Sequence, residues 1–391
     1  MKALRERFGV TLDPVLLFVV ALLILIVGLT MMTSASVAVA ERAMGSPYYY
    51  LQRQSVFLVL GLLCASVFLW VPTHWWARTD FLWLSVALVM LGAVLLPGVG
   101  HTVNGATRWI NLGPMNLQVS EVARLLMFIY VCSYLVRHGP AVRESTMGFV
   151  RPMLFVVFAC ALLLIEPDFG AATVLLGTVL VVMFIGGVRI RDYAVLVLAA
   201  LGAMALLIVN SPYRLKRVLG FLEPWADPYD SGFQLTQSLI AISHGQWAGV
   251  GLGGSVQKLF YLPEAHTDFV FAVLAEELGL IGVIATMALF FVLIARGFAI
   301  ARKAARFDLL FQAYLAYALA TWFALQSFVN IGVNLGALPT KGLTLPFISY
   351  GNNALIMALA SVALLLRVHH ETTLAERAAL KRTPPSRGAF Q

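Results

Sequence analysis

Long apolar stretches separated by short polar connections dominate this chain. Most are about 20 residues long, the length at which a helix crosses the hydrocarbon core of a bilayer. Ten such stretches can be read, at residues 13–34, 51–71, 81–96, 119–136, 152–165, 169–188, 193–209, 269–295, 309–333 and 344–366. The pattern predicts an all-α integral membrane protein with about ten transmembrane helices.

Composition and charge agree with this interpretation. Of the 391 residues, 60% are hydrophobic and 12% are charged, whereas soluble domains carry roughly 25% charged residues. Most of the 27 Lys and Arg residues fall on the side of the spans that holds both termini, which predicts cytoplasmic termini by the positive-inside rule. The net charge of +8 is then explained by this face, and no nucleic acid partner is needed.

The same pattern predicts the organisation of the chain. Residues 1–12 form a basic lead-in on the cytoplasmic side, and residues 13–367 form a ten-span membrane domain. A large extracytoplasmic loop, residues 211–267, joins spans seven and eight. Residues 368–391 are polar and predict a disordered cytoplasmic tail. The three cysteines lie inside spans, as small apolar residues do, and indicate neither disulfides nor a metal site.

Ionisable residues gather where the eighth span begins. Glu264, His266, Thr267 and Asp268 stand at the junction between the long polar loop and an apolar run. Asp268 can simply cap the first turn of the helix that follows. A cluster of ionisable groups at a bilayer edge is, however, costly and is a candidate functional site.

Other polar residues fall on the same outer side. Arg108 lies in a glycine-rich loop, and Lys341 is a lone cation in the last outer loop, where it either anchors at the interface or binds an anion. Glu121 and Arg124 are three residues apart, so they share a helix face and can pair. That pair either satisfies itself or lines an outward-facing polar cavity. Asp168, after Pro167, is expected to cap the sixth span.

The residues alone leave two functional classes open. One is an enzyme that acts at the outer face on an amphiphile with an anionic head, with Asp268 as its base. The other is a transporter or flippase whose charges line a translocation path. No motif for ATP, haem or zinc accompanies the acids and cations.

Several motifs in matching order resemble the SEDS family (shape, elongation, division and sporulation). They are Pro263–Phe269 with Glu276–Gly279, Arg108–Gly113, Glu166–Gly170 and Gly342–Gly351. The similarity extends over roughly residues 13–367 and is closer to the division members of the family than to the elongation members. The chain differs from the family pattern at three places: Arg124 stands where lysine is commoner, Val119 stands where proline is usual, and Asn352–Ala354 replaces the commoner Gly-Ser-Ser.

The resemblance implies a peptidoglycan glycosyltransferase that polymerises lipid II at the outer face of the bacterial inner membrane, at the division septum. Asp268 matches the essential aspartate of the family and would act as general base in an inverting single displacement. Substrate binding would involve Arg108, Glu121, Arg124, Glu264, His266, Thr267, Lys341 and Ser349. A divalent cation, Mg²⁺ or Mn²⁺, could be held partly by Asp268. Implied partners are the lipid bilayer, a class B penicillin-binding protein with transpeptidase activity and other division proteins of the membrane; a flippase or a division scaffold without catalysis is the alternative.

Overall fold

The computed structural model describes residues 12–382 apart from 104–105, 114, 231 and 341. The ten apolar helices found there correspond one for one to the predicted spans. They are α2 (Leu12–Met44), α3 (Tyr49–Trp70), α5 (Asp80–Ala93), α6 (Val119–Glu144), α7 (Thr146–Ile165), α8 (Phe169–Ile185), α9 (Ile190–Val209), α12 (Val270–Arg306), α13 (Leu310–Asn334) and α14 (Asn352–Arg382). The short helix α4 (Thr73–Arg78) connects α3 to α5. The protein is thus a multi-pass membrane protein.

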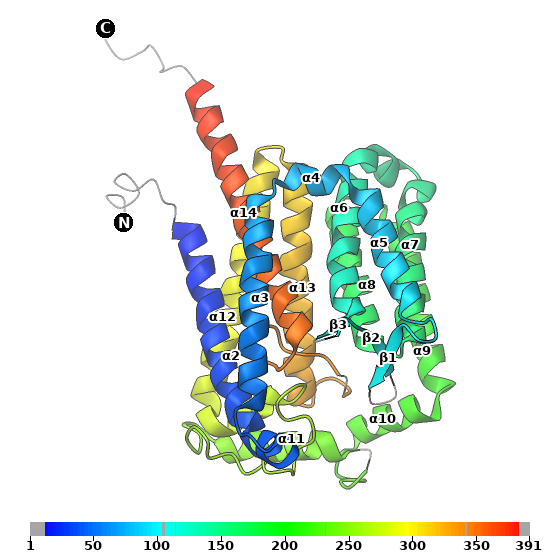
Figure 1. Ribbon diagram of the computed structural model, residues 1–391. Coiled ribbons are helices and arrows are strands. Elements are labelled where there is room, and N and C mark those ends of the chain that lie inside the picture. The colour runs from blue at the N-terminus through cyan, green and yellow to red at the C-terminus, as the bar shows by residue number, and fades with distance from the viewer. Residues whose placement is uncertain (1–11, 104–105, 114, 231, 341, 383–391) are drawn as a thin grey trace.

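The helices pack as one bundle around α6 and α13 (Figure 1). On one side, α3 packs along α14, while α12 packs along α13 and α2. On the other side, α5 and α7 pack against α6, and α8 packs against α13. Helix α6 is buried over most of its length, whereas Asp192 is the buried residue of α9. Helix α6 bends at His138, two residues before Pro140, which cannot complete the helical hydrogen-bond pattern.

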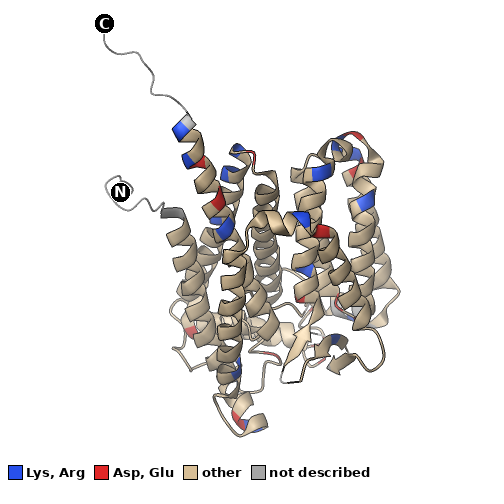
Figure 2. Ribbon diagram, turned by 45° about the horizontal axis from the view of Figure 1, so that its top comes forward, with Lys and Arg blue, Asp and Glu red and all other residues tan. Residues whose placement is uncertain are grey.

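The two ends of the bundle differ in charge and in structure. Helix α2 begins and α14 ends at the same end (Figure 1), and Lys and Arg residues gather there (Figure 2). A small sheet and the helices α10 (Pro212–Leu222) and α11 (Phe233–Gly245) lie at the other end. The positive-inside rule predicts that the basic end faces the cytoplasm, and this orientation stays a prediction.

The sheet was not expected from the sequence, which was interpreted as a glycine-rich loop. Strands β1 (Gly100–Val103), β2 (Ala106–Asn111) and β3 (Asn116–Gln118) pair antiparallel in the order β1-β2-β3. Pairing supplies partners for backbone groups that lie close to the apolar bundle. The turn into β3 is closed by the Asn111 side chain, whose Oδ1 accepts a hydrogen bond from the Gly113 N–H at 2.8 Å. The sheet holds the intervening side chains in fixed directions.

Helix α12 is interrupted, although one continuous span was predicted. Gly279 has a φ of 64°, so the helix breaks there. The backbone of the preceding loop fills the gap, because Gln246 and Trp247 accept hydrogen bonds from the N–H groups of Leu280 and Ile281. Irregular backbone at such a position is tolerated where protein surrounds it. Residues 270–278 therefore form a short segment of α12 with its own start.

Two buried carboxylates next to this break fasten the outer loop to the bundle. Glu276 accepts hydrogen bonds from the Ser255 hydroxyl and from the Val256 N–H. Glu277 accepts a hydrogen bond from Ser34 of α2 at 2.7 Å and pairs with Lys258 Nζ at 2.7 Å. Buried charges are stable only when paired and hydrogen-bonded in this way. The motif Glu276–Gly279 therefore fixes the loop that leads to the segment around Asp268.

The ends of several helices differ from the predicted boundaries. Helix α2 continues to Met44, ten residues beyond the predicted span. Helix α14 begins at Asn352 and continues to Arg382, so the prediction of a disordered tail is incorrect for residues 368–382. Contacts that the sequence does not reveal stabilise this extension, including an ion pair between Lys303 of α12 and Glu376 at 2.7 Å. Residues 1–11 and 383–391 lie outside the described part of the chain.

Close packing of α11 on α12 makes one glycine sensitive to substitution. A Cβ atom added at Gly245 would lie 1.9 Å from the backbone oxygen of Ala275, which cannot move aside. We expect Gly245→Ala to lower the free energy of unfolding by roughly 1–3 kcal/mol, as overpacking does. Gly202→Ala on α9 is the control, because no heavy atom lies within 4 Å of its added Cβ. Equal melting temperatures for the two variants in detergent would contradict this packing.

Candidate active site

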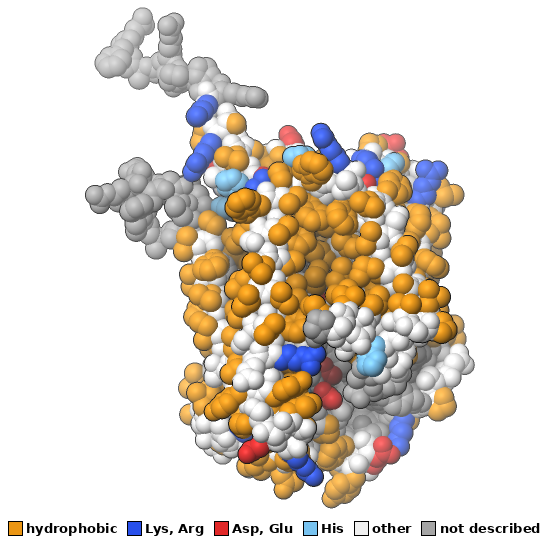
Figure 3. Space-filling model, in the orientation of Figure 1, with side chains coloured by type: hydrophobic (Ala, Val, Ile, Leu, Met, Phe, Trp, Pro, Cys, Tyr) orange, Lys and Arg blue, Asp and Glu red, His pale blue; other side chains and the backbone are white. Residues whose placement is uncertain are grey.

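A cavity of about 1010 Å³ opens at the end of the bundle that carries the sheet. Its walls come from the start of α3, the sheet, the α7–α8 turn, α9 to α11, the turn before α12 and the α13–α14 loop. Figure 3 shows a broad hydrophobic belt, with charged side chains of both signs around a hollow below it. Met204, Ile208 and Val218 give part of the wall an apolar surface. A cavity with polar and apolar walls suits an amphiphile.

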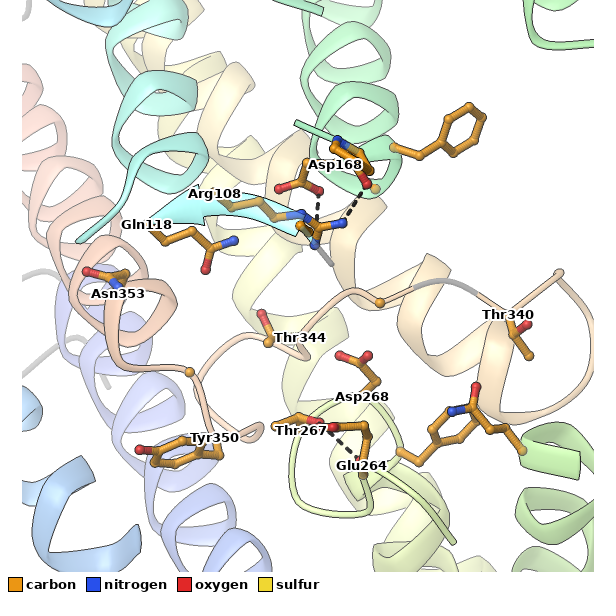
Figure 4. Close-up of a pocket in the computed structure, with 18 of the residues that line it drawn as sticks. Arg108, Gln118, Asp168, Glu264, Thr267, Asp268, Thr340, Thr344, Tyr350 and Asn353 are labelled. Atoms are coloured by element: carbon orange, nitrogen blue, oxygen red, sulfur yellow. Dashed lines mark hydrogen bonds and ion pairs between the residues drawn. The ribbon is translucent and has the colours of Figure 1, made fainter. Parts of the chain in front are cut away.

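Asp268 lies inside this cavity, between the turn that carries Thr267 and the loop that carries Thr344 (Figure 4). Two asparagines of α13 hold its backbone: Asn330 Nδ2 and Asn334 Nδ2 donate to the Asp268 carbonyl at 3.0 and 3.1 Å. The α13–α14 loop passes close to the Asp268 carboxylate at Gly342, where an added Cβ would lie 3.1 Å from Asp268 Oδ2. The two asparagines thus fix the backbone of Asp268, and Gly342 leaves room for its carboxylate.

Another helix supplies a partner for the first turn of α12. The N-cap of α12 is Phe269, and its side chain makes no cap hydrogen bond. Asn334 Oδ1 of α13 accepts a hydrogen bond from the Ala272 N–H at 3.1 Å. Asn334 therefore performs part of the capping task that the sequence suggested for Asp268.

This arrangement makes Asn334 important for stability. Asn334 is fully buried, and Asn334→Leu would keep the number of side-chain heavy atoms while leaving the Ala272 N–H and the carbonyls of Asp268 and Asn330 without this partner. We expect the free energy of unfolding to fall by on the order of 2 kcal/mol, the cost of a buried unpaired group. Thermal unfolding in detergent measures the effect, with Asn210→Leu at the exposed end of α9 as the control. An unchanged melting temperature for Asn334→Leu would contradict the assigned role.

The neighbours of Asp268 in the sequence also line the cavity, as predicted. Thr267 Oγ1 donates a hydrogen bond to Glu264 Oε2 at 2.6 Å. The His266 carbonyl accepts a hydrogen bond from the Tyr350 N–H at 2.8 Å, which ties this turn to the loop before α14. Burial lowers the pKa of His266, while nearby Glu264 opposes this effect. His266 is therefore neutral at physiological pH.

Arg108 projects from β2 into the same cavity and binds the α7–α8 turn. Its Nε donates to the Glu166 carbonyl at 3.3 Å, and its guanidinium lies 4.0 Å from Asp168 Oδ1 (Figure 4). Asp168 caps α8 as expected, because its Oδ1 accepts from the Ala171 N–H at 3.1 Å. Burial, strengthened by the neighbouring Asp168, raises the pKa of Glu166 to about 8 against the opposing effect of Arg108. Glu166 thus adds little charge at neutral pH.

The structure does not bring every predicted residue to the cavity. Glu121 and Arg124 pair with each other, but both are buried, and Arg124 lies 4.6 Å from the centre of the Trp322 ring. Neither lines the cavity, so of the two alternatives the structure shows the self-satisfied pair, and their role in substrate binding stays a prediction. Ser349 is also buried, and its Oγ accepts a hydrogen bond from the Leu345 N–H at 2.7 Å. Lys341 lies outside the described residues.

Sequence reasoning missed several residues of the cavity. Arg53, in the first turn of α3, is a second cation of its lining, and it donates to the Tyr49 hydroxyl at 3.1 Å. The sequence does show a cation near the start of an apolar helix, which could have indicated this residue. It was overlooked because the neighbouring tyrosines were interpreted as interface anchors. Asp168 was given only a structural role, because its distance from Arg108 cannot be read from the sequence. Tyr50, Asn352 and Asn353 also line the cavity.

The described residues fit a divalent cation only in one way. Between residues 12 and 382, with the gaps stated above, no group of three or more His, Cys, Asp or Glu could enclose a metal. Mg²⁺ is, however, commonly held by one or two carboxylates together with substrate phosphates. Asp268 can supply one such carboxylate. A metal here would therefore depend on the substrate for its remaining ligands.

Comparison with known proteins identifies the family. The sequence model of the family of FtsW, RodA and SpoVE cell cycle proteins matches residues 14–374 of this chain. The chain belongs to this family. The SEDS resemblance that its motifs indicated is thus confirmed.

Relatives and solved structures of the family cover nearly the whole chain. A protein of Thioalkalivibrio sulfidiphilus named probable peptidoglycan glycosyltransferase FtsW is 52% identical over 99% of this chain and 95% of its own length. A protein of Hahella chejuensis with the same name is 50% identical over 91% of this chain and 90% of its own. The division branch of the family, favoured by the motifs, is the branch of both relatives.

Solved structures agree with the fold. A chain of the structure described as "Structural coordination of polymerization and crosslinking by a peptidoglycan synthase complex" is 32% identical, with a TM-score of 0.74 over 91% of this chain and 97% of that chain. The Rod shape determining protein RodA of Thermus thermophilus is 31% identical, with a TM-score of 0.67 over 91% of this chain and 96% of that chain. The bundle described above is therefore the fold of this membrane family.

Proposed function

We propose that this protein is a peptidoglycan glycosyltransferase that polymerises lipid II at the outer face of the bacterial inner membrane during cell division. The observation that carries the proposal is the position of Asp268, whose carboxylate lines a large cavity with both polar and apolar walls. Lipid II, a disaccharide–pentapeptide on an undecaprenyl diphosphate, is an amphiphile with an anionic head. The names of the two FtsW relatives support the same activity.

Asp268 is the general base in this proposal. Its carboxylate takes the proton from the 4-hydroxyl of the acceptor sugar as that oxygen attacks the anomeric carbon of the donor. The bond from the anomeric carbon to the diphosphate breaks as the new glycosidic bond forms, and the diphosphate leaves on its prenyl carrier. One displacement inverts the anomeric centre, so an α-linked donor gives a β-linked polymer without a covalent sugar–enzyme intermediate.

Arg108 is the described cation best placed to assist the leaving diphosphate. It lies on the opposite side of the cavity from Tyr350 (Figure 4). Its hydrogen bonds to the α7–α8 turn hold the guanidinium in place. A fixed cation stabilises charge that develops on a leaving group more than a mobile one does. Mg²⁺ or Mn²⁺ held by Asp268 and the substrate phosphates would add positive charge at the same place.

The proposal includes partners and orientation. One similar solved chain belongs to a peptidoglycan synthase complex described as coordinating polymerisation and crosslinking. We expect this chain to work with a class B penicillin-binding protein that crosslinks its product, and with other division proteins of the membrane. Both termini would be cytoplasmic, which places the cavity on the outer side, where glycan strands are made.

A transport assay in proteoliposomes separates this function from lipid II flipping. Purified protein is reconstituted with its transpeptidase partner and with fluorescent lipid II, and both transbilayer movement and glycan formation are measured. The proposal predicts glycan strands without faster movement of lipid II across the bilayer. Rapid movement without polymer would favour a flippase. Neither activity, with division proteins still recruited in cells, would favour a scaffold.

A further inference from the structure

One wall of the cavity combines aromatic rings with amide side chains. We call the set Tyr50, His266, Tyr350, Asn352 and Asn353 the aromatic–amide wall; all five line the cavity. They come from three places in the chain: the start of α3, the turn before α12 and the start of α14. The backbone hydrogen bond from Tyr350 to His266 joins two of these places.

The three rings of this wall contact one another. The ring centres of Tyr50 and His266 are 4.7 Å apart, and those of Tyr50 and Tyr350 are 4.9 Å apart. The His266 and Tyr350 centres are 5.8 Å apart. Mutual packing restricts the rotation of each ring, so the wall offers a fixed apolar surface with polar edges. Such a surface suits a rigid ring that is apolar on its face and polar on its edge.

Each amide of the wall has an oxygen that receives no hydrogen bond within the described part of the chain. Asn353 is only 6% exposed, and its Nδ2 donates to the Asn116 carbonyl at 2.8 Å. Its Oδ1 and the Oδ1 of Asn352 are buried without a hydrogen-bond partner among the described residues. A buried acceptor without a partner is unfavourable. Both residues line the cavity, so a molecule bound there is the nearest source of the missing donors.

The excess of acceptors discriminates between the parts of the substrate. A diphosphate offers oxygen acceptors only, so it would place oxygen against oxygen at the two amides. A sugar ring offers hydroxyl donors, and an N-acetylated sugar adds an amide N–H. The apolar face of such a ring fits the aromatic surface. The two amide oxygens therefore match the saccharide better than the diphosphate, which Arg108 is placed to bind.

We infer that the aromatic–amide wall binds the N-acetylated acceptor sugar and directs its 4-hydroxyl toward Asp268. This assignment rests on the proposed function, which supplies the substrate class. His266 stands two residues before Asp268 in one turn, so one element of the cavity carries both a ring of the wall and the base. Asn352 and Asn353 then determine specificity for the acceptor, and Asp268 performs the chemistry on it.

Binding of a soluble disaccharide tests the inference without catalysis. The probe is N,N′-diacetylchitobiose at millimolar concentration, observed by saturation-transfer NMR on the purified protein in nanodiscs. Cellobiose, with hydroxyls in place of the acetamido groups, is the comparison sugar. Wild-type protein is expected to bind the diacetylated sugar and to bind it better than cellobiose. Asn353→Ala and Tyr50→Leu are expected to weaken binding roughly tenfold, the effect of one lost hydrogen bond or ring contact.

Two further variants make the result specific. Asp268→Asn should still bind the sugar, because it keeps the wall intact. Gln52→Ala, one residue before Arg53 on the exposed side of α3, should behave as wild type in binding and in activity. In polymerisation assays, Asn353→Ala should raise KM for lipid II by a similar factor and leave kcat nearly unchanged. Melting temperatures identify any variant that fails to fold. Because Tyr50→Leu lies on α3 and Asn353→Ala on α14, misfolding of one variant leaves the other as a valid test.

The outcomes separate this inference from the proposed function. Equal sugar binding by wild type, Asn353→Ala and Tyr50→Leu, or no binding by wild type, would overturn the assignment even if lipid II is polymerised. Binding that is lost in the wall variants, without polymer from any variant, would keep the sugar site and overturn the polymerase.

Discussion

We expect Asp268→Asn to abolish glycan polymerisation while the protein stays folded. Asparagine keeps the size of the side chain but cannot accept the proton of the acceptor hydroxyl. A positioned general base contributes about 10²- to 10⁴-fold to a rate, so we expect kcat to fall by at least the lower figure. The fold should survive, because asparagine keeps the size of the side chain and Asn334 supplies a side-chain partner for the first turn of α12.

The control for this variant is Asp230→Asn. Asp230 is an exposed acid of the same outer segment, where it pairs with Lys216. Its loss should leave kcat within about twofold of wild type, since exposed ion pairs contribute little. Both variants are compared with wild type by the rate of lipid II consumption and by melting temperature. Wild-type kcat in Asp268→Asn would remove Asp268 as the base.

The second large effect is expected at Arg108. Arg108→Ala removes a fixed cation from the cavity and leaves the carbonyls of the α7–α8 turn without their donor. Loss of one electrostatic group of this kind lowers kcat by about 10²- to 10³-fold. Arg108→Lys keeps the charge but not the planar fork that contacts Glu166, Pro167 and Asp168 at once. We therefore expect an intermediate rate.

Arg42→Ala is the matched control for Arg108. The Arg42 guanidinium lies 4.9 Å from the centre of the Phe260 ring and does not line the cavity. Its removal should change kcat little. The measurement is steady-state polymerisation at saturating lipid II, which separates kcat from binding. A wild-type kcat for Arg108→Ala would show that the leaving diphosphate is stabilised elsewhere.

Apolar length allowed the helices to be predicted, because a segment that crosses a bilayer must satisfy its backbone internally. The position of Asp268 could be predicted for a related reason: ionisable residues at the edge of an apolar run are unusual. Which face of a helix meets which neighbour could not be predicted. Helix α6 is apolar around its whole circumference, so its pattern does not show that Glu121 and Arg124 face the interior.

Features that depend on distant contacts were also beyond the sequence. The break at Gly279 requires the backbone of Gln246 and Trp247, which lies more than 30 residues earlier in the chain. The sheet depends on pairing among short strands whose alternation is weak. The cavity role of Asp168 depends on Arg108 in another element. In each case the local residues are compatible with a simple turn or helix, and the structure that forms is determined by a contact with a distant segment.

The most direct test of the account is polymerisation of lipid II by the purified protein with its transpeptidase partner, comparing wild type with Asp268→Asn. Products are separated by length on a gel and digested with a muramidase to confirm that they are glycan. The account predicts long, digestible strands from wild type and none from a folded Asp268→Asn. Equal strands from both, or unchanged lipid II with wild type, would contradict it.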